Sequence, residues 1–250
     1  MDDALLAAIY ADPDDDAPRH VLADALIDRG DPRGEFISMQ LARGRKDVRI
    51  ARELELQQAH AGEWLGALAS VIDVRRSKFE RGFLSHASIV PNTKKQLRQL
   101  ATEPGWATVE RFITGVPPQL LDRCSFTALR AIDVNRGEFR RLARRGDALA
   151  RVVDLKLATT VDLDVAARVF PALRRVHLRY APEPSELVAF AALGVRELEV
   201  ERMRFYDYDE IDYTELLEAL CDRRTSFERV MLGEIELRRG DDGMLHQVVA

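Results

Sequence analysis

A six-residue phrase that returns at nearly constant spacing is the feature that most constrains how this chain folds. The phrase reads apolar-x-x-apolar-x-apolar. Its clear copies are Leu129-x-x-Ile132-x-Val134, Val152-x-x-Leu155-x-Leu157, Leu173-x-x-Val176-x-Leu178, Val195-x-x-Leu198-x-Val200 and Phe227-x-x-Val230-x-Leu232. The middle apolar positions of the first four copies are 23, 21 and 22 residues apart, and the last step is 32. The longer step predicts an insertion of about ten residues into a repeat of this length.

Each phrase predicts a short strand, because side chains of a strand point to opposite faces with a period of two. Two weaker copies, Leu84-x-x-Ala87-x-Ile89 and Val109-x-x-Phe112-x-Thr114, precede the clear ones. Apolar residues at helical spacing in 138–149 and 185–193 predict helices between the strands. Strand–helix units repeated in order predict a parallel sheet with helices on its other side. An ordinary α/β domain with coincidental spacing is the alternative, and three near-equal steps argue against it.

The residues between the apolar positions are expected to project from the concave face of this sheet. Neighbouring strands lie about 4.8 Å apart, so these residues would form rows across the strands. Opposite charges tend to be neighbours in the rows, which predicts a docking surface for a protein partner. On two neighbouring strands the expected facing pairs are Arg175 with Glu197, His177 with Glu199 and Arg179 with Glu201. A self-neutralising network of exposed ion pairs, worth ~0–1 kcal/mol each, stays open as the alternative. The candidate partner-binding residues are Asp133, Asp154, Lys156, Arg175, His177, Arg179, Glu197, Glu199 and Glu201.

Two further expectations concern this surface and the insertion beside it. His177 would lie between acidic neighbours, which predicts a raised pKa. The inserted residues 202–213 carry four aromatic side chains among charges in a chain that is 7% aromatic. Aromatic and arginine side chains are common interface anchors, so Phe205, Tyr206 and Tyr208 are candidate partner-binding residues. A loop folded back over the edge of the sheet, with its rings as a cap, is the alternative.

The phrases resemble the leucine-rich-repeat family over residues 82–234. Members of that family form curved solenoids whose concave strand face or adjoining loops usually bind proteins. The family's asparagine, three residues after the last apolar position, is replaced here by Gly137, Thr160, Ala181 and Met203, and only Asn92 in the weakest copy fits. The resemblance therefore implies a solenoid with a parallel sheet and degenerate turns, whose role is protein–protein interaction.

Residues 2–44 predict three short helices ahead of the repeats. The first ends before Asp12-Pro13, and the second is expected to bury Val21, Leu22, Ala25 and Leu26. Gly30 would stop the second helix, Asp31 would cap the third and Pro32 would be its first residue. A fourth, more polar helix is expected at about 48–59.

The stretch from Asp12 to Ile37, with its Gly-Asp-Pro-Arg-Gly-Glu-Phe core, resembles the bacterial repeat-companion domain. That module commonly precedes leucine-rich-type repeats, and it implies no established biochemical activity. One departure is Ala25, where many members carry tryptophan. The expected organisation is a helical module over 1–70, which we expect to cap the first repeat, and a solenoid over 71–250. The stretch 234–249 has the pattern of a terminal hairpin that would protect the last sheet edge.

Other classes of function find little support in the sequence. The acids 14–16 lack the spacing of a calcium loop, and capping of the second helix explains them more simply. The five histidines are scattered and no nucleotide or nucleophile motif occurs, so we expect no catalysis, metal or cofactor. The alternatives kept open are a hydrolase-type site of concave carboxylates with His177, and a structural subunit of a larger assembly.

The remaining expectations concern partners and compartment. A net charge of −5 argues against nucleic acid, and the arginines around 140–145 and 75–78 are interpreted as solvated. No apolar run reaches the ~20 residues that span a bilayer, and Cys124 and Cys221 are expected to be free thiols. The sequence thus predicts a cytoplasmic adaptor with a protein partner and with no nucleic acid, membrane or small-molecule substrate.

Overall fold

The structure is a computed structural model that describes residues 2–42, 48–158, 161–202, 218–220, 225 and 227–248. The chain divides into two compact units, Met1–Leu129 and Arg130–Ala250. We call them the first and the second unit. The expected boundary near residue 70 lies inside the first unit and stays a prediction about sequence modules.

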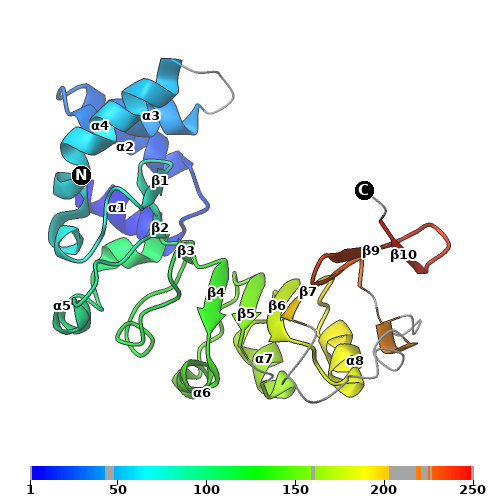
Figure 1. Cartoon of the computed structure of the whole chain (residues 1–250). Coiled ribbons are helices and arrows are strands. Elements are labelled where there is room, and N and C mark those ends of the chain that lie inside the picture. The colour runs from blue at the N-terminus through cyan, green and yellow to red at the C-terminus, as the bar shows by residue number, and fades with distance from the viewer. Residues whose placement is uncertain are drawn as a thin grey trace. The chain divides into compact units, whose positions relative to one another are not determined.

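The first unit begins with helices and continues into short strands (Figure 1). Strands β1 and β2 are antiparallel, and β2 and β3 are parallel with Ala87 opposite Phe112, the middle positions of the two weaker phrases. The elements are α1 (Asp2–Ala11), α2 (Ala17–Ile27), α3 (Pro32–Leu41), α4 (Val48–Leu65), η1 (Gly66–Ser70), β1 (Lys78–Glu80), β2 (Phe83–Ala87), α5 (Lys94–Gln99), η2 (Pro104–Thr108) and β3 (Arg111–Phe112).

The three predicted N-terminal helices are confirmed, with the expected start and stop residues. Gly30 has a φ of 73°, a left-handed conformation that suits glycine after a helix end. The Asp31 side chain accepts a hydrogen bond from the Arg33 N–H at 2.9 Å, and Pro32 begins α3. The fourth helix is longer than predicted and runs to Leu65.

One prediction about the second helix is wrong. Val21 was expected in its buried face, but its side chain is 52% exposed, whereas Ala23 is 1% exposed. The buried positions of α2 are Arg19, Leu22, Ala23 and Leu26. They follow the i, i+3, i+4, i+7 spacing of one helical face, which places Val21 on the outer side.

The helices pack against the hairpin of β1 and β2 through one apolar cluster and one buried amide. Ile9, Leu22, Leu26, Ile37 and Phe83 belong to this cluster. The amide of buried Gln40 donates to the Phe79 carbonyl at 3.0 Å and accepts from the Gly82 N–H at 2.8 Å. Both polar ends of the side chain are thus satisfied at the hairpin turn.

The second unit is a strand–helix alternation followed by a hairpin. Its elements are β4 (Ala131–Val134), α6 (Arg136–Arg145), β5 (Asp154–Leu157), α7 (Leu163–Val169), β6 (Arg175–Tyr180), α8 (Pro184–Ala192), β7 (Glu197–Arg202), β8 (Arg229–Leu232), β9 (Ile235–Arg239) and β10 (Leu245–Gln247). Strands β4 to β8 are parallel neighbours in chain order. The unit is therefore α/β with an open, mostly parallel sheet, as the phrases predict.

The register joins equivalent positions of successive phrases. Ile132 lies opposite Leu155, Leu155 opposite Val176, Val176 opposite Leu198 and Leu198 opposite Val230. All five side chains are at most 3% exposed. Helices α6, α7 and α8 lie together on one side of these strands (Figure 1). Their buried side chains meet the apolar positions of the strands, so the core of the unit lies between helices and sheet. The buried helix residues are Phe139, Leu142, Ala166, Val169, Leu187, Phe190 and Ala191.

The predicted C-terminal hairpin is confirmed. Strand β9 pairs antiparallel with β8 and with β10. It therefore occupies the edge that β8 would otherwise present to another chain. Among the described helices, none combines the length and the apolar character that crossing a membrane requires.

Candidate functional site

Two rows of mostly polar side chains run across strands β4 to β8 on the face away from the helices. The first row joins Asp154, Arg175, Glu197 and Arg229, with Ala131 on β4 before them. The second row is Asp133, Lys156, His177, Glu199 and Met231. Period-two alternation puts these residues opposite the buried apolar positions, which is why the rows could be predicted. We call these two rows, with Arg179 and Glu201 one step along β6 and β7, the strand face.

Arg175 and Glu197 form an ion pair with two hydrogen bonds on the strand face. Arg175 donates from Nε to Glu197 Oε2 and from Nη2 to Glu197 Oε1, both at 2.9 Å. The Nη1 atom of Arg175 also lies 3.7 Å from Asp154 Oδ2. A guanidinium that meets a carboxylate through two parallel bonds fixes the orientation of both groups. Strands β5, β6 and β7 are therefore linked by side chains as well as by backbone.

His177 lies between two carboxylates, as its position in the row predicts. Its Nε2 is 3.0 Å from Asp154 Oδ1, and its Nδ1 is 2.9 Å from Glu199 Oε2. The hydrogen bond with Asp154 raises the pKa of His177 above its usual 6.5, with further raising by the charges of Asp154 and Glu199. Burial and the charge of Arg175 act against this shift. An imidazolium can donate from both ring nitrogens, so the protonated form fits this position best.

Asp154 differs from the other charged residues of the rows because its exposure is only 8%. It accepts from His177 and lies near Arg175, so a nearly buried carboxylate has two cationic neighbours. Burial of a carboxylate is costly unless such partners are present. The sequence placed Asp154 in the row but gave no sign that its neighbours would cover it.

The C-terminal hairpin extends the network by one strand, which the sequence did not predict. Glu236 on β9 lies opposite Met231, and its Oε1 accepts from Arg229 Nε at 2.8 Å and from Arg238 Nε at 2.7 Å. These bonds lower the pKa of Glu236, that from Arg229 most. The hairpin pattern was visible in the sequence, but its pairing with β8 depends on a register that the phrases do not encode.

The third expected charge pair is not formed. Arg179 was expected to face Glu201, yet Glu201 Oε2 lies 3.9 Å from Lys156 Nζ. Within the described residues, the side chains of Arg179 and Asp133 take part in no ion pair or hydrogen bond, and both are exposed. The strand face therefore offers a free cation and a free carboxylate beside its paired groups.

The aromatic candidates Phe205, Tyr206 and Tyr208 lie outside the described residues, as does the rest of 203–213. Arg202, the first residue of the insertion, ends strand β7. The role of the insertion in binding stays a prediction.

In the described parts of the chain, no group of three or more His, Cys, Asp and Glu side chains is arranged to hold a metal ion. Cys124 is buried and is not part of a disulfide, and Cys221 lies outside the described residues. Of the acids 14–16, Asp15 accepts from the Ala17 N–H at 2.9 Å, and Asp16 lies near Arg19 and Arg81. These contacts belong to the start of α2.

Comparison of the chain with protein-family models, with curated proteins and with solved structures finds no match. The resemblances to leucine-rich repeats and to the repeat-companion domain therefore stay predictions from sequence.

Proposed function

We propose that the chain is a non-catalytic interaction module, built as a leucine-rich-repeat-like solenoid, whose strand face binds a protein partner. The observation that carries the proposal is the strand face itself. It presents regularly spaced charges on parallel strands, whereas helices cover the other side of the same sheet. Parallel sheets usually have both faces covered, and the exceptions include repeat proteins that bind partners on an open face.

The energetics of the surface are compatible with exchange of partners. Ion pairs with exposed members are worth ~0–1 kcal/mol each, so a binding partner could replace them at small cost. Arg175 and Glu197 are both part-exposed, with side-chain exposures of 42% and 33%. Because both residues lie on paired strands of the sheet, less conformational entropy would be lost when a partner binds them.

The geometry of His177 favours binding over acid–base chemistry. Both ring nitrogens are engaged by carboxylates of the chain, so neither is free to take a proton from a substrate. The pocket between α6 and α7 includes none of the strand-face residues. Neither the engaged ring nitrogens nor the location of this pocket supports the hydrolase-type alternative.

Exchanging the charges of one pair tests the proposal. The double variant Arg175→Glu with Glu197→Arg keeps an internal pair and the net charge but reverses the pattern that a partner meets. Arg52 and Glu35 form a similar two-bond pair in the first unit, at 3.0 Å for both bonds. The matched control is the exchange Arg52→Glu with Glu35→Arg.

Proteins recovered from host lysate with the wild-type chain are purified, and their affinities for the three chains are measured by calorimetry. We expect a partner that binds the wild type and the control alike and the strand-face variant at least about tenfold more weakly. If every recovered protein binds both double variants equally, the rows only neutralise themselves and the proposal fails.

The segment 202–213 has its own test. Substitution of Phe205, Tyr206 and Tyr208 by serine is expected to lower the affinity of the chain for the same partner, because aromatic side chains contribute much of the binding energy at many interfaces. Unchanged affinity of the folded variant would remove this segment from the proposed interface.

A further inference from the structure

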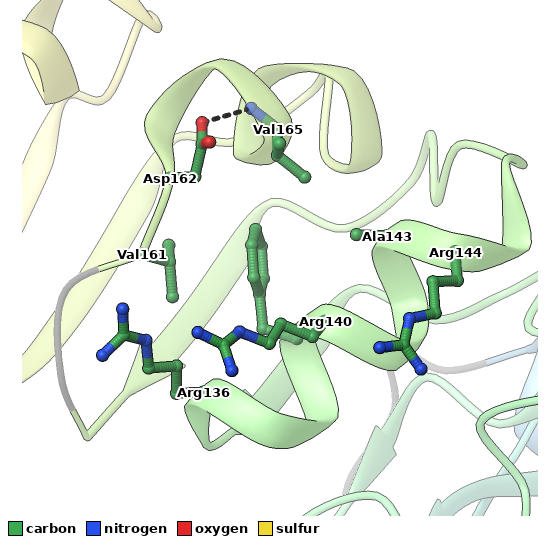
Figure 2. Close-up of a pocket in the computed structure, with 8 residues that line it drawn as sticks. Arg136, Arg140, Ala143, Arg144, Val161, Asp162 and Val165 are labelled. Atoms are coloured by element: carbon green, nitrogen blue, oxygen red, sulfur yellow. Dashed lines mark hydrogen bonds between the residues drawn. The ribbon is translucent and has the colours of Figure 1, made fainter.

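A second charged surface lies on the helix side of the second unit, where α6 and α7 border a pocket of about 610 Å³. This volume is in the range of ligand-binding sites in proteins. Figure 2 shows three arginines in a row along α6 and the start of α7 across from them. The lining residues are Arg136, Phe139, Arg140, Ala143, Arg144, Val161, Asp162 and Val165.

Arg136, Arg140 and Arg144 form a row of uncompensated positive charge. They follow one another at intervals of four residues, which places them about 6 Å apart along the helix axis. All three are exposed, and in the described part of the chain none of their side chains makes a hydrogen bond or ion pair. Arg145, one residue further, does pair with Asp147 at 2.7 Å. Like charges at this spacing destabilise a helix slightly. An anionic ligand bound to the row would reduce the repulsion between the three guanidinium groups.

The floor of the pocket is apolar. Phe139 is 3% exposed and packs near Phe170, with ring centroids 6.3 Å apart. Val165 on α7 and Val161, two residues before the start of that helix, also line the pocket (Figure 2). Asp162 is the one carboxylate among the lining residues, and its Oδ1 accepts from the Val165 N–H at 3.1 Å as the cap of α7. The pocket therefore combines a cationic rim with an apolar base.

We infer that this pocket binds an extended acidic peptide segment of a protein partner. Alternate side chains of an extended strand lie on one face about 6.6–6.8 Å apart, close to the spacing of the arginines. Guanidinium groups bind carboxylates through paired hydrogen bonds. An apolar side chain beside the acidic stretch would fill the base.

An acidic peptide fits the whole chain better than nucleic acid does. The net charge of −5 repels a long polyphosphate outside this one row. A short acidic segment needs only the three arginines and the apolar base. The helices lie on the opposite side of the sheet from the strand face (Figure 1), so the two surfaces can be occupied together and the inference stands apart from the proposed function.

The probe is a labelled peptide with glutamate at alternate positions and leucine at both ends, and binding is followed by fluorescence anisotropy. The variant is Arg136→Gln, Arg140→Gln and Arg144→Gln together, since glutamine preserves helix propensity. The control replaces Arg75, Arg76 and Arg98 by glutamine, which are exposed, lie outside the pocket and change the net charge equally. Circular dichroism verifies that both variants are folded.

We expect saturable binding to the wild type, a loss of affinity of about tenfold or more in the pocket variant, and a change within about twofold in the control. The strand-face exchange Arg175→Glu with Glu197→Arg should leave peptide binding unchanged, which separates this inference from the proposed function. Absence of saturable binding, equal loss in both arginine variants, or tighter binding of a single-stranded oligonucleotide of equal charge would each overturn it.

Discussion

At Gly34, helix α3 packs closely against the backbone of α2. A Cβ atom at this position would lie 2.7 Å from both the Ala23 carbonyl oxygen and the Ile27 nitrogen. Both are backbone atoms of α2, which cannot move without shifting the helix. The requirement for glycine here comes from packing, since its φ is not in the left-handed region.

Gly34→Ala is therefore expected to lower the free energy of unfolding by about 1–3 kcal/mol, as overpacking does. Gly62→Ala is the matched control, because Gly62 lies in α4 and a Cβ there meets nothing within 4 Å. Alanine there should stabilise the chain by about 0.5–1 kcal/mol through helix propensity. Denaturant titration measures both changes, and equal effects of the two substitutions would contradict this account.

The stretch from Gly30 to Phe36 shows which roles of single residues can be predicted from the sequence and which cannot. Gly30, Asp31 and Pro32 act through local backbone geometry, so their roles could be predicted. Arg33 instead lies over the ring of Phe83, 4.9 Å from its centroid, fifty residues further along the chain. That contact, like the need for glycine at position 34, depends on the tertiary fold and left no local signal.

His177 should titrate above 6.5, in a direction opposite to that of His86. The bond to Asp154 raises the pKa of His177, whereas burial lowers the pKa of His86. A raised folded pKa means that the stabilisation by His177 is complete below about 6.5 and is lost as pH rises through the folded value. For His86 the stabilisation is lost as pH falls.

Residue-resolved NMR titration separates the two histidines. Substitution His177→Gln is expected to lower stability more near pH 5.5 than near pH 8.5, because only the protonated ring donates to both carboxylates. Asp154→Asn should lower the pKa of His177, since the hydrogen bond with Asp154 is the main cause of the raised value. A pKa of His177 at or below 6.5 in the wild type would show that the two carboxylates do not stabilise the protonated ring.

At the scale of elements, α6 is defined at both ends by side-chain and backbone signals. Asn135 Oδ1 accepts from the Gly137 N–H at 2.8 Å and from the Glu138 N–H at 3.1 Å, and the Glu138 side chain accepts from the Asn135 N–H at 2.9 Å. Gly146, with a φ of 79°, follows the last residue of the helix. The apolar spacing predicted this helix at 138–149, and these two signals explain its earlier start and end.

Asn135→Ala is expected to lower the free energy of unfolding by about 1 kcal/mol, because two helix N–H groups lose their acceptor. Asn135→Asp keeps the acceptor and should cost much less. Thermal or denaturant unfolding of the two variants measures the difference. Equal destabilisation by alanine and aspartate would mean that the cap contributes nothing.

The strands show what spacing can and cannot predict. The phrases fixed which residues of β4 to β8 lie opposite one another, because every copy has the same length and polarity pattern. Partner choice within the rows was harder to predict, as Lys156 reaches Glu201 in place of Arg179. Long side chains have several rotamers. Strand register therefore limits which residues can form an ion pair with a given side chain, but it does not determine which of them does.

At the scale of the whole molecule, amide exchange should reveal a gradient within the second unit. Strand β6 has parallel partners on both sides, and its apolar residues Val176 and Leu178 are at most 2% exposed. Strand β10 pairs with β9 alone among the described strands, and its three residues are exposed or half-buried. Exchange follows the free energy of local opening, which is highest where burial and pairing are greatest.

We expect the slowest amides of the second unit in β6 and its neighbours and the fastest strand amides in β10, as measured by hydrogen–deuterium exchange. Peptides from the first unit, at Phe83 to Ala87, provide an internal reference that does not depend on these pairings. Equal protection of β10 and β6 would show that the hairpin is as stable as the centre of the sheet.

The antiparallel course of β9 has a consequence for how such a chain could change in length. The edge of β8 is already bonded to a strand of opposite direction, so a further strand running with β8 has no place there. Additional strand–helix units would have to be inserted upstream of β8, and each would widen both polar rows by one residue. The breadth of charge offered to a ligand would then scale with the number of inserted units, while the closing hairpin stayed the same.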